Sequence, residues 1–260
     1  MAVGLQGTCA MLLALGAGNG LNASIGIPHA EFRRTYSLCP NGRIVIENLY
    51  GDVRITAWDR DEVLVEAIKR SPDARRLDDA RIVVDSSAGL LSIHTRYAGS
   101  DAVHPASVEY RITVPRGASL ADVKLINGGL SISGVAGPVK ASSVNGNIKA
   151  ENLEGQADLS TINGQLEADF NRISRQNPIS LSSVNGPIRL SIPAGAGASV
   201  TARNLSGGID SEFGRPFRAT GGHRLQAIVH GGGAQIHLRN VNGGISIHAT
   251  WSRRAVRPVS

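Results

Sequence analysis

Apolar and polar residues recur with a nine-residue period through the middle of the chain. Five consecutive units run from Lys124 to Ala168, with the sequences KLINGGLSI, SGVAGPVKA, SSVNGNIKA, ENLEGQADL and STINGQLEA. The third position of each unit is apolar, the fifth is glycine, and the seventh and ninth are mostly apolar around a polar eighth. This alternation predicts a short strand after each glycine, and the fixed period is typical of a repeat architecture.

The fourth position of the unit alternates, and this doubles the period. Asn127, Asn145 and Asn163 are eighteen residues apart, whereas Ala136 and Glu154 fill the same position between them. An Asn-Gly step supplies the positive φ of a tight corner. Two architectures fit such corners: an antiparallel meander, because Asn-Gly also favours hairpins, and a parallel solenoid with a corner at both ends of each strand.

The apolar positions of one unit favour the solenoid. Ile148, Ala150 and Leu153 do not keep the strict alternation that a meander requires, whereas a corner after each strand accommodates the break. We therefore predict an all-β fold, a parallel β-solenoid (β-helix or β-roll) with coils of roughly eighteen residues. In this arrangement Val144 and Ile148 are expected to point into a narrow core.

Residues one coil apart should lie side by side, because stacked strands are separated by roughly 4.8 Å. Polar residues at equivalent positions would then form ladders that stabilise the stack. The predicted asparagine ladder comprises Asn127, Asn145, Asn163, Asn185 and Asn242. The predicted pairs of stacked opposite charges on the outer face are Lys140 with Asp158 and Lys149 with Glu167.

The chain divides into four predicted segments. They are a signal peptide over residues 1–23, N-terminal β-coils or a cap over 36–123, the Asn-Gly repeat solenoid over 124–250, and a basic tail over 251–260. Further units of the pattern occur at 38–46, 47–55, 182–190, 203–211 and 239–247. Residues 169–181 and 212–230 interrupt it and are expected to be loops or longer coils.

The N-terminal segment alternates differently from the repeat. Residues 63–68, 81–85, 90–96 and 108–114 read as strands, and these would form wider coils or an antiparallel edge over the end of the solenoid. Ser71 and Pro72 predict a short helix that continues to Ala80, with Ser71 as its cap. Trp251 and the basic tail would cap the other end.

Composition limits the possible location and partners. The apolar stretch from Ala10 to Ala17 has the length of a secretory signal and not of the ~20 residues that span a bilayer. We therefore expect an extracytoplasmic protein without a transmembrane segment. The net charge is +6, but the basic residues are dispersed and aromatic residues make up only 4%. Nucleic acid is thus not the expected partner, because its binders cluster basic residues with stacking aromatics.

The order of these segments resembles a bacterial family of unknown function that is labelled "putative adhesin". The resemblance rests on VRITAWDRDEVLVEA (Val53–Ala67), VEYRITVPRGASL (Val108–Leu120) and the Asn-Gly-x-Ile repeats, and it extends from about Leu38 to Ala249. It implies a β-solenoid in an extracytoplasmic bacterial protein and brings no catalytic residues. The insertions after Asp169 and Phe213 depart from the family pattern.

Candidate chemistry along the chain is sparse. Calcium-binding nonapeptide repeats carry aspartate at each corner, whereas the corners here carry Asn-Gly. Asp158, Glu167 and Asp169 are the nearest candidates for the paired carboxylates of a carbohydrate-active enzyme. His223, His230 and His237 recur every seven residues, which is not the coil period. No GxSxG nucleophile motif occurs.

The sequence therefore predicts a non-enzymatic scaffold that needs no cofactor or metal and binds a glycan or a surface protein. The alternatives are a carbohydrate-active β-helix enzyme and a sensory or regulatory component of the envelope. The pattern does not specify an oligomeric state.

Overall fold

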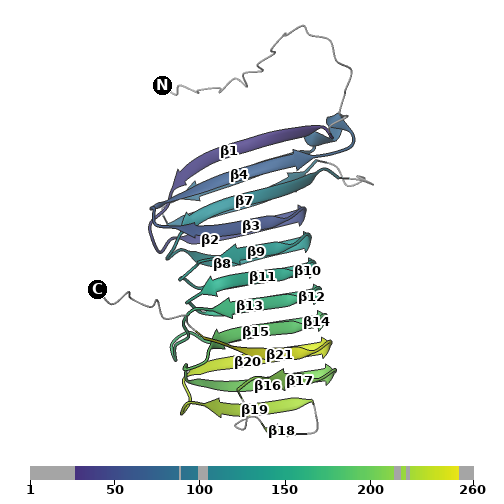
Figure 1. Cartoon of the computed structure of the whole chain (residues 1–260). Coiled ribbons are helices and arrows are strands. Elements are labelled where there is room, and N and C mark those ends of the chain that lie inside the picture. The colour runs from purple at the N-terminus through teal and green to yellow at the C-terminus, as the bar shows by residue number, and fades with distance from the viewer. Residues whose placement is uncertain (1–26, 88, 99–104, 214–217, 221–222, 252–260) are drawn as a thin grey trace, which may run out of the picture.

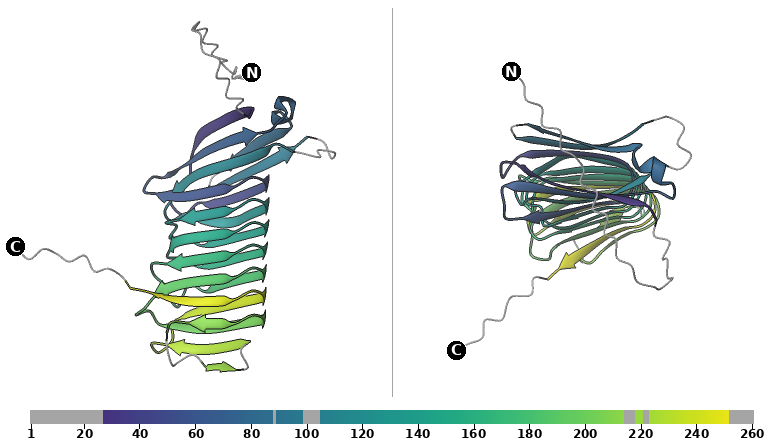
Figure 2. Two further views of the ribbon diagram at one scale, coloured as in Figure 1. Left: turned by 45° about the vertical axis from the view of Figure 1, so that its right-hand side comes forward. Right: turned by 90° about the horizontal axis from the view of Figure 1, so that it is seen from above.

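The computed structural model describes residues 27–87, 89–98, 105–213, 218–220 and 223–251 of the 260-residue chain. These residues form an all-β column of two large, mostly parallel sheets that face one another (Figures 1 and 2). The predicted signal peptide lies outside the described residues, as does the tail beyond Trp251.

Sheet A contains ten strands among the described residues. Their spatial order is β1 (His29–Ser37), β4 (Glu62–Arg70), β7 (Ser107–Pro115), β3 (Val53–Trp58), β9 (Leu130–Ser133), β11 (Ile148–Leu153), β13 (Leu166–Phe170), β15 (Ile188–Pro193), β21 (Ile245–Thr250) and β17 (Ile209–Ser211).

Sheet B contains eleven strands in the same part of the chain. Their spatial order is β18 (Arg218–Thr220), β19 (Arg224–Val229), β16 (Ala198–Ser206), β20 (Ala234–Asn242), β14 (Ile179–Asn185), β12 (Ala157–Asn163), β10 (Val139–Asn145), β8 (Ser119–Asn127), β2 (Arg43–Tyr50), β6 (Leu90–Tyr97) and β5 (Ala80–Ser87).

A strand of sheet B and the next strand of sheet A form one coil. In the middle of the column the coils follow one another in sequence, from β8–β9 through β10–β11 and β12–β13 to β14–β15. Parallel pairing sets side chains eighteen residues apart opposite one another between β10 and β12, as with Val139 and Ala157, and 22 residues apart between β12 and β14, as with Asn163 and Asn185. An Asn-Gly step forms the corner between the two strands of each of these coils.

Both ends of the column depart from a simple solenoid in which each coil follows the last. The final coil in sequence, β20–β21, lies between β14–β15 and β16–β17, as the yellow strands among the green ones show (Figure 1). At the other end the first coil, β2–β3, lies between β6–β7 and β8–β9. In each case the chain passes beyond a coil, reverses, and returns.

Antiparallel strands cover both ends of the column. In sheet A, β4 pairs antiparallel with β7 and β1 with β4, and in sheet B β5 pairs antiparallel with β6. This is the antiparallel edge that was one of the two expectations for the N-terminal segment. At the far end β19 and β18 continue sheet B in the antiparallel sense, so residues within the 212–230 insertion form the cap there. Trp251 does not, because it follows an internal strand and is exposed.

The predicted helix from Ser71 to Ala80 is wrong. The segment contains only a four-residue 3₁₀ turn, Ala74–Leu77, which is capped by Asp73 through a 3.0 Å hydrogen bond from the Arg75 amide. Asp73, Arg75 and Arg76 are polar, and Leu77 is the buried residue of the turn. The segment therefore lacks the apolar stripe that stabilises a longer helix.

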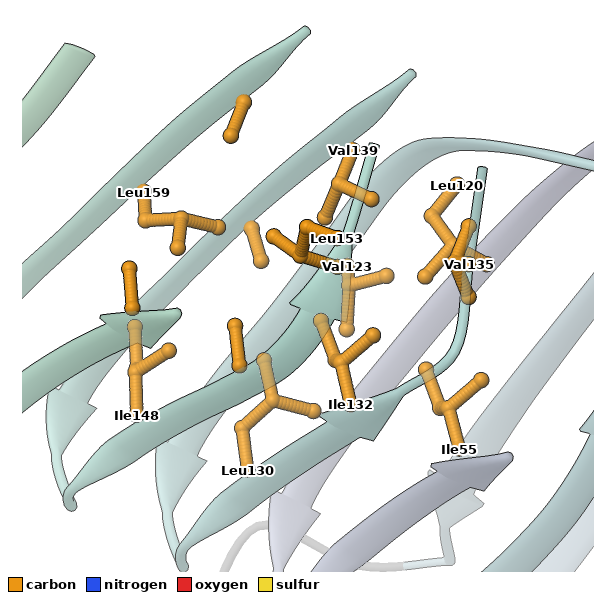
Figure 3. Close-up of a cluster of buried hydrophobic side chains, with 14 of the residues drawn as sticks. Ile55, Leu120, Val123, Leu130, Ile132, Val135, Val139, Ile148, Leu153 and Leu159 are labelled. Carbon is orange, nitrogen blue, oxygen red and sulfur yellow. The ribbon is translucent and has the colours of Figure 1, made fainter. Parts of the chain in front are cut away.

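The core is the narrow space between the two inner sheet faces. Figure 3 shows Leu130, Ile132 and Ile148 from sheet A meeting Val123, Val139 and Leu159 from sheet B, with Val135 and Leu153 at one corner. All of these side chains are buried, as are the small alanines at 141, 150, 157 and 168 between them. Alternating large and small inward residues lets the two faces interdigitate closely.

Candidate binding face on sheet B

Five asparagine side chains form a continuous ladder at the corner where sheet B strands end. Nδ2 of each donates to Oδ1 of the asparagine on the neighbouring coil, at 2.8–2.9 Å. The ladder runs Asn242 to Asn185, Asn185 to Asn163, Asn163 to Asn145, and Asn145 to Asn127. The ladder continues unbroken from β14 to β20 although 57 residues separate Asn185 and Asn242 in sequence. Four of these side chains are exposed and Asn127 is half-buried, so the ladder lies on the molecular surface.

Beside the ladder runs a row of aliphatic side chains on the outer face of sheet B. Strand register places one of them on each of seven adjacent strands, immediately before the corner. The row, which we call the aliphatic row, comprises Leu49, Ile126, Val144, Ile162, Val184, Val241 and Leu205. Ile126, Ile162, Val184 and Leu205 are 38–73% exposed, and the other three are half-buried.

The aliphatic row corrects the prediction that Val144 points inward. The residue that does point inward is its neighbour Ser143, which is 3% exposed. Its hydroxyl contacts the carbonyl of Gly128 at 3.5 Å, and Thr161 donates in the same way to Gly146 at 3.0 Å. In the units SSVNGNIKA, STINGQLEA and SSVNGPIRL the second position is therefore a small polar residue that satisfies a corner carbonyl from inside, and the third position lies outside.

A polar column lies on the other side of the aliphatic row, two residues earlier in each strand. From one end of sheet B to the other it comprises Glu47, Lys124, Ser142, Ser160, Ser182, Arg239 and Arg203. Three hydroxyl groups thus occupy the middle, and charges gather at both ends. The outer face of sheet B therefore carries a polar stripe and an apolar stripe side by side.

The family of the chain follows from comparison with known proteins. A family model described as Toastrack DUF4097 matches residues 43–248. The chain belongs to the Toastrack DUF4097 family. No curated protein matches its sequence.

Two of the solved structures that match the chain carry names that refer to adhesion. A "putative cell adhesion protein" from Clostridium sporogenes has a TM-score of 0.53 and 13% identity, over 85% of this chain and 100% of its own. A "putative adhesin" from Bacteroides fragilis has a TM-score of 0.40 and 11% identity, over 85% and 97%. At these identities the first likeness shows that the two proteins share a fold.

The predicted charge pairs of this Toastrack protein lie on two different sheets. Strand register sets Lys140 opposite Asp158 on sheet B and Lys149 opposite Glu167 on sheet A. The ammonium of Lys149, however, contacts Glu151 of its own strand at 2.8 Å. The hydrogen bond to Glu151, together with the charges of Glu151 and Glu167, raises the pKa of Lys149.

Three carboxylates gather on the outer face of sheet A of the Toastrack fold. Glu167 and Asp169 project from β13, and Glu151 lies on the adjacent β11. Partial burial raises the pKa of Asp169, and the charges of Glu151 and Glu167 raise it further. Asp158, the third carboxylate considered for catalysis, is on sheet B and belongs to a different face.

The histidines of the second insertion and the last coil do not converge. His237 lies on β20 in sheet B, whereas His248 lies on β21 in sheet A, where its Nδ1 is 2.9 Å from Glu212 Oε1. His230 contacts the carbonyl of Ala194 at 2.9 Å. Within the described ranges, no three His, Cys, Asp or Glu side chains are placed to hold a metal ion. No helix among the described residues is long and apolar enough to cross a membrane.

Proposed function

We propose that this Toastrack protein is a non-enzymatic, extracytoplasmic β-solenoid scaffold that binds a glycan or a surface protein in the manner of an adhesin. The observation that carries the proposal is the aliphatic row. Exposed apolar side chains that gather in one place, bordered by polar groups, are typical of interaction surfaces. Here seven strands contribute an aliphatic side chain in register, four of them exposed and three half-buried, between the asparagine ladder and the polar column.

The construction of the face supports a role in binding. Six of the seven strands that carry the aliphatic row have parallel neighbours on both sides, and β16 has one parallel and one antiparallel neighbour. The ladder joins five of these strands through side chains as well. A partner that docks on such a surface meets groups that are already ordered, so little conformational entropy is lost on binding. The similar fold of the "putative cell adhesion protein" is consistent with this use.

The extracytoplasmic location is proposed from the apolar stretch near the N-terminus and from the adhesion-related names of proteins with this fold. Protease digestion of cells that carry a C-terminally tagged chain tests it. Cleavage in intact cells would place the protein outside, and cleavage only after permeabilisation, with the tag in the periplasmic fraction, would place it in the periplasm. Recovery in the cytoplasmic fraction would contradict the proposal.

Binding is tested with the purified protein on immobilised mucin, fibronectin, collagen and bacterial envelope polysaccharide. We expect the parent to bind at least one of these surfaces and Ile162→Ser to weaken that binding at least about fivefold, because Ile162 lies at the centre of the row. Ile27→Ser is the matched control, since Ile27 is 59% exposed and outside the row. Absence of parental binding to all four surfaces, or equal weakening by both substitutions, would contradict the proposal.

A further inference from the structure

Three arginines lie directly opposite one another at the C-terminal end of sheet B. Arg203 of β16 is in register with Arg239 of β20 on one side and with Arg224 of β19 on the other. All three side chains are exposed on the outer face. Because adjacent strands are ~4.8 Å apart, the three cations form a straight row of about 10 Å. We call this set the arginine row.

Among the described residues, the arginine row has no acidic partner within ion-pair distance. Some exposed arginines elsewhere pair with carboxylates, as Arg33 does with Glu66 and Arg172 with Glu154. None of the ion pairs formed between described residues includes Arg203, Arg224 or Arg239. Like charges directly opposite on adjacent strands destabilise a sheet. The arrangement therefore costs stability that a bound anion would restore.

An open cavity of about 500 Å³ lies over the arginine row. Its lining residues are Arg203, Asn204, Leu205, His223, Arg224, Arg239 and Asn240. Leu205, the last member of the aliphatic row, is 73% exposed and borders the cavity. The cavity thus combines three cations and an apolar edge.

We propose that the arginine row binds the carboxylate or sulfate groups of an acidic polysaccharide. Guanidinium groups bind such oxyanions through paired, charge-assisted hydrogen bonds. This inference rests on the proposed function and names the class of ligand for the same face.

The shape of the site favours a linear polymer. Three cations in a line are complementary to a polymer that carries negative charges at regular intervals along its length. Beyond Arg239 the polar column continues with the hydroxyls of Ser182, Ser160 and Ser142, which offer hydrogen bonds to successive sugars. An anionic lipid surface fits less well, because Leu205 alone in the aliphatic row is as much as 73% exposed. Ile126, Ile162 and Val184 are only 38–45% exposed and lie close to the sheet, so the row does not present a set of inserting side chains.

The test measures binding of the whole protein to polygalacturonate and to heparin by biolayer interferometry. We expect binding that weakens as salt is added, because mobile ions screen exposed charges. We expect the double variant Arg203→Gln/Arg239→Gln to bind at least about tenfold more weakly. The matched control is Arg54→Gln/Arg189→Gln, which removes the same charge from the outer face of sheet A and should bind within about twofold of the parent.

A thermal unfolding measurement on both double variants accompanies the binding assay. The variant of the arginine row should unfold at the same or a higher temperature than the parent, because it relieves like-charge repulsion. Arg224→Gln provides a single-site version of the binding test. Equal loss in both double variants, no parental binding to either polymer, or binding only to vesicles of phosphatidylcholine and phosphatidylglycerol would overturn the inference. If Ile162→Ser still weakened binding to the immobilised surfaces in such a case, the proposed function would stand without this inference.

Discussion

Glycine at the coil corner is required by the closeness of the next coil. A Cβ atom added at Gly146 would lie 1.9 Å from the carbonyl oxygen of Gly128, and one added at Gly164 would lie 2.2 Å from that of Gly146. Neither glycine has a positive φ, whereas Gly128 and Gly186 do. The sequence analysis explained the corner glycines by the positive φ that glycine allows. At Gly146 and Gly164 glycine is required instead because a side chain there would collide with the neighbouring coil.

Gly146→Ala should therefore destabilise the protein by about 2–3 kcal/mol, because the new methyl group meets backbone atoms that cannot rotate away. Urea unfolding of the purified variant measures this difference. Gly195→Ala is the matched control, since its Cβ would meet nothing within 4 Å and its φ is not positive. It should change stability by less than about 1 kcal/mol, in the stabilising direction. Equal stability of the two variants would contradict the packing account of the corner.

At the scale of the strand, sequence reading identified the inward positions after each glycine but not those before it. Ile148 and Ala150 are buried as the alternation predicted. Before the corner, Ser143 and Thr161 are buried and Val144 and Ile162 lie outside, which reverses the hydropathy rule. The polar residues turn inward because the corner carbonyls of the neighbouring coil need donors, and an unpaired buried carbonyl is costly. The pattern of apolar and polar residues contains no information about this need for a hydrogen-bond donor.

This reversal predicts opposite outcomes for two similar substitutions in one coil. Ile148→Asp should cost more than about 4 kcal/mol and abolish the folded state, because it buries a carboxylate without a partner. Val144→Asp should cost about 1 kcal/mol or less, because residue 144 faces solvent on the outside of β10. Circular dichroism and urea unfolding of both variants make the comparison. Equal loss of structure in the two would show that Val144 belongs to the core.

At the scale of the whole molecule, the repeat specifies the middle coils and leaves their order at the ends open. The units at 182–190, 203–211 and 239–247 share the pattern, so any of them could stack on the same neighbouring coil. The 19 residues of 212–230 are long enough to form the β19 cap and bring the chain back. The arginine row and the aliphatic row arise from this order, since β16 and β20 become neighbours, and the linear sequence could not reveal it.

The internal position of the last coil predicts an unusual response to truncation. A chain that ends at Gly233 lacks β20 and β21, which join β14–β15 to β16–β17. Terminal coils of repeat proteins can be removed with loss of one interface, whereas here a whole block loses its neighbour. We expect residues 194–233 to lose hydrogen-exchange protection while 27–193 keep theirs. A chain lacking only residues 252–260 is the control and should match the parent. Protection of 194–233 in the Gly233 chain would show that β16 packs directly on β14, as a strictly sequential stack requires.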